Sequence, residues 1–413
     1  MPESSPGGAA PVTPAPAGAP TSSGATGAAT YSTTNNQEPG VDEPDIVKTN
    51  GSTIFSVSQG ALYAVDATGV TPRLVGSLDL GAAGYNAQLL LRGQRLIVIS
   101  GGSPVALGAP GPAGVAAPRV AAPTMFPYYS GGQTVVTEID VSNPAAMKVA
   151  RTMNIEGSFV DARQNGSTAR LVISSQPSAV AYPALRAHAK GWVPVMRFHS
   201  RITGRRYTHA VARCNTIRRP TQFSGLGMLT ILTIDLDQGL YAATSESLMA
   251  DALVVYGSQR SLYVATQRWI DPQSSVYGIP RSQSTVIDRF DATDPLRTTY
   301  VASGEVPGFV LNQFSMSEYG GYLRVATTSR PIWWGSGPPR SLSQSYVTVL
   351  ATSGSVLVPV GQVSGLGAGQ QIYSVRFIDN AGYVVTFRQV DPLYTIDLSS
   401  PTAPRVAGQL ELA

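Results

Sequence analysis

Leu393-Tyr-Thr-Ile-Asp397-Leu-Ser-Ser-Pro401 is a strand of alternating apolar residues that closes on an aspartate and runs into a proline turn. The arrangement recurs along the chain. Copies lie at Ala61-Leu-Tyr-Ala-Val-Asp66, Thr137-Glu-Ile-Asp140-Val-Ser-Asn-Pro144, Leu232-Thr-Ile-Asp235, Ile287-Asp-Arg-Phe-Asp291 and Val347-Thr-Val-Leu-Ala-Thr-Ser-Gly354. An aspartate closes five of these six copies, where its carboxylate can accept backbone N–H groups of the following turn. We interpret these aspartates as turn caps, with metal ligation as the alternative.

Two further strands precede each copy, and a fourth follows it. Tight turns join the first two strands, as at Asn165-Gly166, Tyr319-Gly-Gly321 and Asp379-Asn-Ala-Gly382, which are hairpin signals. The 42 glycines, 31 prolines and only 13% charged residues suit many short strands joined by turns. We therefore predict an all-β fold, a β-propeller of about six four-stranded blades. A sandwich or two separate β-domains are the alternatives.

The first 40 residues differ in composition from the rest. Of residues 1–30, 27 are Gly, Ala, Pro, Ser or Thr, which predicts a disordered tether over 1–40 before a propeller domain over 41–413. The tether lacks the charged and apolar regions of a signal peptide. No apolar run is long enough to span a membrane, so no transmembrane segment is expected. An export signal is thus not visible in this chain.

The units differ mainly in the connection between their second and third strands. Long insertions are expected at 101–133, 176–227, 268–284 and 328–344. In a propeller these connections leave on the same face, where loop-borne function commonly lies. All four tryptophans fall within the insertions: Trp192, Trp269, Trp333 and Trp334. We predict that they contribute to a binding surface, and the alternative is that they anchor the loops to the blades.

The third unit carries most of the positive charge. Between Ala162 and Ile234 there is no acidic residue, against eleven basic ones. Such a patch attracts anions, so we predict an interaction scaffold for a protein partner or an anionic cell-surface polymer; nucleic acid is disfavoured because stacking residues are few. The alternative is that this arginine-rich segment is only a solvent-exposed loop, whose charges pair with the acidic residues of the rest of the domain. The predicted ligand-binding arginines are Arg197, Arg201, Arg205, Arg206, Arg218 and Arg219.

Sequence signatures of catalysis are absent, so no catalytic residue and no cofactor are predicted, and a non-enzyme is favoured. The alternative is a calcium-assisted hydrolase or lyase at the mouth of the central channel. Its metal ligands would be Asp42, Glu43 and Asp45, unless these carboxylates bond backbone amides instead. Further channel-mouth candidates are Asp161, Asp251, Asn312 and Arg376.

A resemblance adds to this interpretation. It rests on Tyr31-Ser-Thr-Thr-Asn-Asn-Gln-Glu-Pro-Gly-Val-Asp-Glu-Pro-Asp-Ile-Val-Lys-Thr-Asn-Gly51, Phe223-Ser-Gly-Leu-Gly-Met-Leu-Thr-Ile-Leu-Thr-Ile-Asp235 and Val384-Val-Thr-Phe-Arg-Gln-Val-Asp-Pro-Leu-Tyr394. The chain resembles a family of uncharacterised secreted prokaryotic proteins with a propeller distantly related to WD-type repeats. The resemblance implies a secreted or cell-surface location and supplies no catalytic residue. Relatives continue past Ala413, so truncation from a larger propeller is an alternative to closure by six blades.

Overall fold

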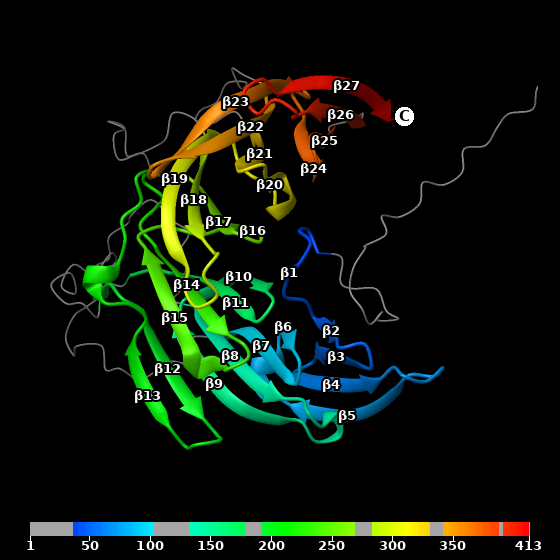
Figure 1. Cartoon of the computed structure of the whole chain (residues 1–413), viewed down its shortest axis with the longest axis vertical. Coiled ribbons are helices and arrows are strands. Elements are labelled where there is room, and N and C mark those ends of the chain that lie inside the picture. The colour runs from blue at the N-terminus through cyan, green and yellow to red at the C-terminus, as the bar shows by residue number, and fades with distance from the viewer. Residues whose placement is uncertain are drawn as a thin grey trace, which may run out of the picture. The chain divides into compact units, whose positions relative to one another are not determined.

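The computed structural model describes residues 36–102, 132–177, 191–268, 283–330, 342–387 and 391–412. Within these ranges the regular structure is β-strand, with short 3-10 turns and no α-helix (Figure 1). The strands form five sheets. The all-β prediction is therefore confirmed. No helix within these ranges is long and apolar enough to cross a membrane.

The first and last sheets are simple four-stranded meanders, in which each strand pairs with the next in sequence. We name them sheets I and V. Sheet I contains β2 (Val47–Thr49), β3 (Thr53–Ser58), β4 (Ala61–Asp66) and β5 (Arg73–Asp79). Sheet V contains β24 (Gln371–Ile378), β25 (Ala381–Phe387), β26 (Asp391–Asp397) and β27 (Arg405–Leu412).

Sheets II and III are meanders with added strands. The strand order in sheet II is β13-β12-β9-β8-β7-β6, and in sheet III it is β1-β10-β11-β14-β15. Sheet II contains β6 (Gln88–Arg92), β7 (Arg95–Gly102), β8 (Gln133–Asp140), β9 (Lys148–Glu156), β12 (Val195–Ser200) and β13 (Arg206–Ala210). Sheet III contains β1 (Val41–Asp42), β10 (Ser158–Asn165), β11 (Thr168–Ser175), β14 (Met228–Asp235) and β15 (Ala243–Leu248).

Sheet IV has eight strands and consists of two meanders. One parallel pair, Ser303 with Val356, joins them. The first meander contains β16 (Val254–Gly257), β17 (Ser261–Gln267), β18 (Ser284–Asp291) and β19 (Thr299–Pro307). The second contains β20 (Met316–Tyr319), β21 (Tyr322–Ser329), β22 (Gln344–Ser353) and β23 (Val356–Leu366). Among the described residues, five 3-10 turns accompany the sheets: Gly81–Gly84, Pro144–Ala146, Cys214–Thr216, Leu240–Ala242 and Gln313–Ser315.

The aspartates that close the third strands are turn caps, as predicted. In each case an aspartate oxygen accepts the backbone N–H of the residue two positions later, at 2.8 to 3.0 Å. The five are Asp66, Asp140, Asp235, Asp291 and Asp397. Because the carboxylate satisfies donors that the turn would otherwise leave open, each copy ends its strand at the same point.

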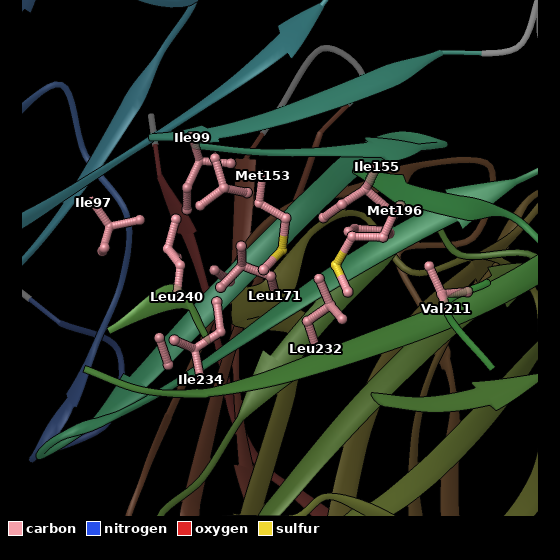
Figure 2. Close-up of a cluster of buried hydrophobic side chains, with 14 of the residues drawn as sticks. Ile97, Ile99, Met153, Ile155, Leu171, Met196, Val211, Leu232, Ile234 and Leu240 are labelled. Atoms are coloured by element: carbon pink, nitrogen blue, oxygen red, sulfur yellow. The ribbon is translucent and has the colours of Figure 1, made fainter. Parts of the chain in front are cut away.

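Apolar side chains pack between neighbouring sheets. The cluster in Figure 2 joins sheets II and III: Ile97, Ile99, Met153 and Ile155 face Leu171, Leu232 and Ile234. Met196 of β12 and Val211, just after β13, belong to the same buried cluster. Burying each large apolar side chain contributes about 1.5–3 kcal/mol, so this packing fixes the β12–β13 hairpin to the domain.

The hairpin does not lie where the sequence placed it. The insertion between β11 and β14 was expected to gather with the others over one face of a disk. Instead β12 pairs antiparallel with β9, so the hairpin extends the outer edge of sheet II (Figure 1). The exposed backbone groups of β9 supply the pairing partner. Most of the other three insertions lies outside the described residues.

Candidate binding surface

The β12–β13 hairpin is the most exposed part of the basic region. All ten residues from 201 to 210 are exposed, although β12 itself is partly buried. The strands are paired in register, with Phe198 opposite Tyr207 and His199 opposite Arg206. Two hydrogen bonds close the ladder: Ser200 N donates to Arg205 O, and Val211 N donates to Pro194 O, each at 2.9 Å. The hairpin is therefore a regular, well-anchored element.

Aromatic rings stack along one face of the hairpin. The Phe198 and Tyr207 ring centroids are 4.5 Å apart, and the Tyr207 and His209 centroids are 5.3 Å apart. Phe198 is 4% exposed and Tyr207 37% exposed. The partial burial of Tyr207 raises the pKa of its hydroxyl. The stack therefore runs from the core to the outer strand and holds β13 in place.

The arginines of this region divide into three groups. One group is exposed and forms no ion pair among the described residues: Arg201, Arg205, Arg206, Arg213 and Arg219. No carboxylate lies near them in sequence, because the segment from Ala162 to Ile234 has none. We call these five the free arginines. They are the exposed cations of this region that no carboxylate pairs with in the described part of the chain.

A second group is already paired to other sheets or strands. Arg197 Nη2 is 3.2 Å from Glu156 Oε1, and Arg218 Nε is 3.0 Å from Glu246 Oε1. Two of the six arginines predicted to bind a ligand are thus already neutralised by carboxylates of the protein. Exposed ion pairs of this kind contribute little to the free energy of unfolding. Their main effect is to hold β12 and the segment around Arg218 in position.

The third group is buried. Arg163 and Arg170 are each 2% exposed and lie in β10 and β11. Arg170 donates to the carbonyl oxygens of Ala292 and Asp294, both at 2.8 Å, and therefore joins sheet III to sheet IV. Burial lowers the pKa of Arg170. Neither residue can contribute to a surface patch. Arg186 and Lys190 lie outside the described residues.

Of the four tryptophans, the structure describes Trp192 alone. It is half-buried against the cluster that joins sheets II and III. That position favours the anchoring role over a ligand contact for this residue. Trp269, Trp333 and Trp334 lie outside the described residues, so their role stays a prediction.

The segment from Gln37 to Asp45 contacts three sheets, which the sequence did not reveal. Gln37 Nε2 donates to the carbonyls of Gln313 (3.1 Å) and Met316 (2.8 Å) in the second half of sheet IV. β1 pairs with β10 of sheet III. Asp45 exchanges two backbone hydrogen bonds with Leu89 of β6 in sheet II. The distinctive opening motif of the chain therefore ties the first strands of separate meanders together.

The three predicted calcium ligands belong to this segment and have protein partners. Asp42 Oδ1 is 2.7 Å from Lys48 Nζ. Glu43 Oε2 accepts from Gln313 Nε2 at 2.7 Å, and Asp45 Oδ1 accepts from the Ile46 N–H at 2.6 Å. Within the described ranges no group of three or more His, Cys, Asp or Glu side chains could hold a metal ion. The calcium hypothesis stays a prediction, testable as a calcium-dependent rise in Tm.

The other channel-mouth candidates also have structural partners. Asp161 Oδ2 is 2.7 Å from Arg163 Nη1, and burial raises the pKa of Asp161. Asp251 accepts the Gly227 N–H at 2.9 Å, and burial raises its pKa as well. Asn312 caps the 3-10 turn before β20, and the Arg376 guanidinium lies 3.8 Å from the Phe314 ring centroid. Each of the four therefore contacts a described residue, and their place at a channel mouth stays a prediction.

A cavity of about 520 Å³ lies beside the same segment, between turns of the two halves of sheet IV. Glu38, Arg289 and Glu318 are among its lining residues. Tyr256, next to the cavity, donates its hydroxyl to Glu38 Oε1 at 2.6 Å and accepts the Glu318 N–H at 2.7 Å. Burial raises the pKa of Glu38, and the Tyr256 hydrogen bond opposes the shift. Tyr256 thus links the opening segment to both halves of sheet IV.

Tyr256→Phe is expected to destabilise the domain by about 1–3 kcal/mol, because the Glu38 carboxylate and the Glu318 N–H lose their partner while staying partly buried. Urea unfolding followed by far-UV circular dichroism measures the change. Tyr241→Phe is the matched control, since Tyr241 is 55% exposed, and it is expected to stay within about 0.5 kcal/mol of the unchanged protein. Equal stability of the two variants would contradict the assignment.

Residues 31–413 match the family described as "Beta propeller domain". The chain belongs to the β-propeller domain family. An uncharacterized protein of Methanocaldococcus jannaschii is 25% identical over 431 residues, covering 92% of this chain and 62% of that protein. An uncharacterized protein of Archaeoglobus fulgidus is 41% identical over 107 residues, covering 26% and 15% respectively. The chain thus spans less than two thirds of the length of each relative.

The solved structures that match this β-propeller domain are distant from it. A variant of the Synechocystis apocarotenoid oxygenase is 10% identical, with a TM-score of 0.34 and coverage of 89% of this chain and 71% of that one. Apo AztD from Citrobacter koseri is 11% identical, with a TM-score of 0.27 and coverage of 90% and 94%. At these values the likeness carries no inference about activity.

Proposed function

We propose that this β-propeller domain is a binding scaffold whose basic hairpin, β12–β13 with its flanking segment, engages an anionic protein or cell-surface polymer. The observation that carries the proposal is the group of five free arginines on and next to the hairpin. An anion there gains charge-assisted hydrogen bonds without first breaking an internal ion pair. The paired residues Arg197 and Arg218 are less available, so the contact centres on Arg201, Arg205 and Arg206.

The number of blades and the cellular location of the domain are also part of the proposal. Six four-stranded blades are proposed, one each from sheets I, II, III and V and two from sheet IV, since each contains four strands paired in chain order; in sheet III, β12 and β13 intervene between the second and third of them. An exported location is proposed from the resemblance of residues 31–51 and the tether-like composition of residues 1–30. Protease treatment of intact cells tests the location, because an exported domain would be digested and a cytosolic one protected.

Arg205→Gln combined with Arg206→Gln is expected to weaken retention on immobilised polyglutamate by about 5- to 10-fold at low salt, because two unpaired surface cations are lost. Retention should also fall with added salt, since the screening length shrinks to about 8 Å at physiological ionic strength. Arg260→Gln combined with Arg297→Gln removes the same charge from exposed positions away from the hairpin. If that control weakens retention equally, binding follows net charge and the hairpin is not the site.

A further inference from the structure

The outer edge of β13 is open. β13 is the terminal strand of sheet II, and within the described part of the chain no strand pairs with its far side. In an antiparallel ladder, hydrogen-bonded pairs alternate with non-bonded ones. The bonds from Ser200 N to Arg205 O and from Val211 N to Pro194 O set this alternation. The N–H and C=O groups of Arg206 and Thr208 therefore point away from β12, toward the open edge.

The two faces of this edge differ in chemistry. Residues directly opposite each other share a face, so Arg206 and Thr208 lie on the same face as His199 and Arg197. That face is basic. Tyr207 and His209 lie on the other face, stacked in line with Phe198. A strand added at the edge would thus meet cations on one side and aromatic rings on the other.

The charge decides between occupants. A second copy of the chain, pairing β13 with β13, would add further arginines and no carboxylate to the ladder, because residues 201–210 contain no Asp or Glu. Like charges on paired strands are destabilising, so self-pairing is disfavoured. An acidic extended segment would instead bring carboxylates to Arg206, which forms no ion pair among the described residues, whereas Glu156 already pairs with Arg197. Residues 201–210 contain no Asp or Glu, so this edge favours an anionic partner.

We infer that β13 is a docking edge for an extended acidic segment of a partner protein, which adds to sheet II as a further strand. Backbone groups of the segment pair with Arg206 and Thr208. Its side chains alternate, with acidic residues over the basic face and apolar residues over the Tyr207 face. The inference rests on the proposed function for its charge but differs in requiring a free backbone edge, which a polymer without peptide groups would not use.

The test uses the full chain and a peptide of alternating glutamate and valine, with polyphosphate, an anion that has no peptide groups, as the second probe. Thr208→Pro removes an outward N–H while keeping every charge, a change tolerated on edge strands. It is expected to weaken binding of the alternating peptide by at least about tenfold and to leave salt-sensitive retention on polyphosphate nearly unchanged. Bound peptide should also slow hydrogen exchange of the Arg206 and Thr208 amides by at least about tenfold.

A second arm keeps the protein unchanged. The same peptide with N-methylated glutamates cannot donate along the edge, because in an antiparallel pairing the glutamates lie opposite Arg206 and Thr208. Its affinity should fall by a similar factor, and this arm decides if the proline variant does not fold. Full affinity of the N-methylated peptide, or unprotected Arg206 and Thr208 amides, overturns the docking edge while leaving charge-driven binding intact. If Arg205→Gln with Arg206→Gln weakens neither probe, the proposed function itself fails.

Discussion

Asp288→Asn is expected to stabilise the domain by about 2–4 kcal/mol at pH 7 and by almost nothing at pH 4. Asp288 lies in the middle of β18 with no exposed surface, opposite Val264 and Ser303 of the flanking strands. Neither of its carboxyl oxygens has a hydrogen-bond partner among the described residues. Ser224 lies nearby, but its hydroxyl donates to the Gln222 carbonyl at 3.1 Å. Burial therefore dominates the energetics of this carboxyl group, and the Ser224 hydroxyl opposes it only in part.

The pH dependence follows from the proton balance. Burial raises the pKa of Asp288 from 3.8 to about 8. Between these values the folded chain holds a proton that the unfolded chain has released. Stability of the unchanged protein therefore falls as pH rises, by up to about 1.4 kcal/mol per unit, and levels off above pH 8. Asparagine has no proton to lose, so the advantage of the variant grows over the same window.

Urea unfolding at pH 4, 6 and 8 measures this difference. Asp291→Asn on the same strand is the matched control. Burial favours the protonated form of Asp291, but the hydrogen bonds from Thr293 outweigh it and lower the pKa of that carboxyl. The control should therefore lose stability on substitution, and its loss should shrink at low pH. A gain for Asp288→Asn that is the same at pH 4 and pH 8 would contradict a buried, protonated carboxyl group.

The features that the sequence predicted are local in the chain. Asp397 and its counterparts bond a residue two positions away, so the composition of one turn is enough to place them. The turn after β24 is similar, because Asp379 has a positive φ of 46° and Ala381 pairs with Ile378 within the same hairpin. The alternation of apolar and polar residues on either side of each turn then placed the strands, which together form the meanders. The fold class followed because one local unit recurs.

The features that the sequence missed depend on distant contacts. β12 pairs with Lys148–Glu156 across a whole meander, and no local pattern specifies which edge an inserted hairpin will join. Arg163 and Arg170 counted as surface charge, although both lie inside strands with apolar neighbours, a signal that could have separated them from the insertion. Gln37 and Glu38 lay within the predicted tether, because their partners in sheet IV are more than 200 residues away.

Arg163→Met is expected to destabilise the domain by about 3–5 kcal/mol, the largest loss among these variants. The Arg163 guanidinium is buried and 2.7 Å from Asp161 Oδ2. It also donates to Val255 O of β16 at 2.6 Å and to the side chain of Gln313, which in turn donates to Glu43. One side chain therefore connects sheet III, both halves of sheet IV and the opening segment. Methionine keeps the apolar stem but leaves the Asp161 carboxylate unpaired.

A double variant separates the lost ion pair from the lost volume. Burial already raises the pKa of Asp161, and Arg163 is the charge that opposes this shift. Once the arginine is removed, the buried carboxylate carries most of the cost, so adding Asp161→Asn to Arg163→Met should recover about 1–3 kcal/mol. Urea unfolding of the four proteins in this cycle gives the coupling free energy. If the double variant is no more stable than Arg163→Met, the loss comes from the severed bonds to Val255 and Gln313. The guanidinium would then serve mainly to join the meanders.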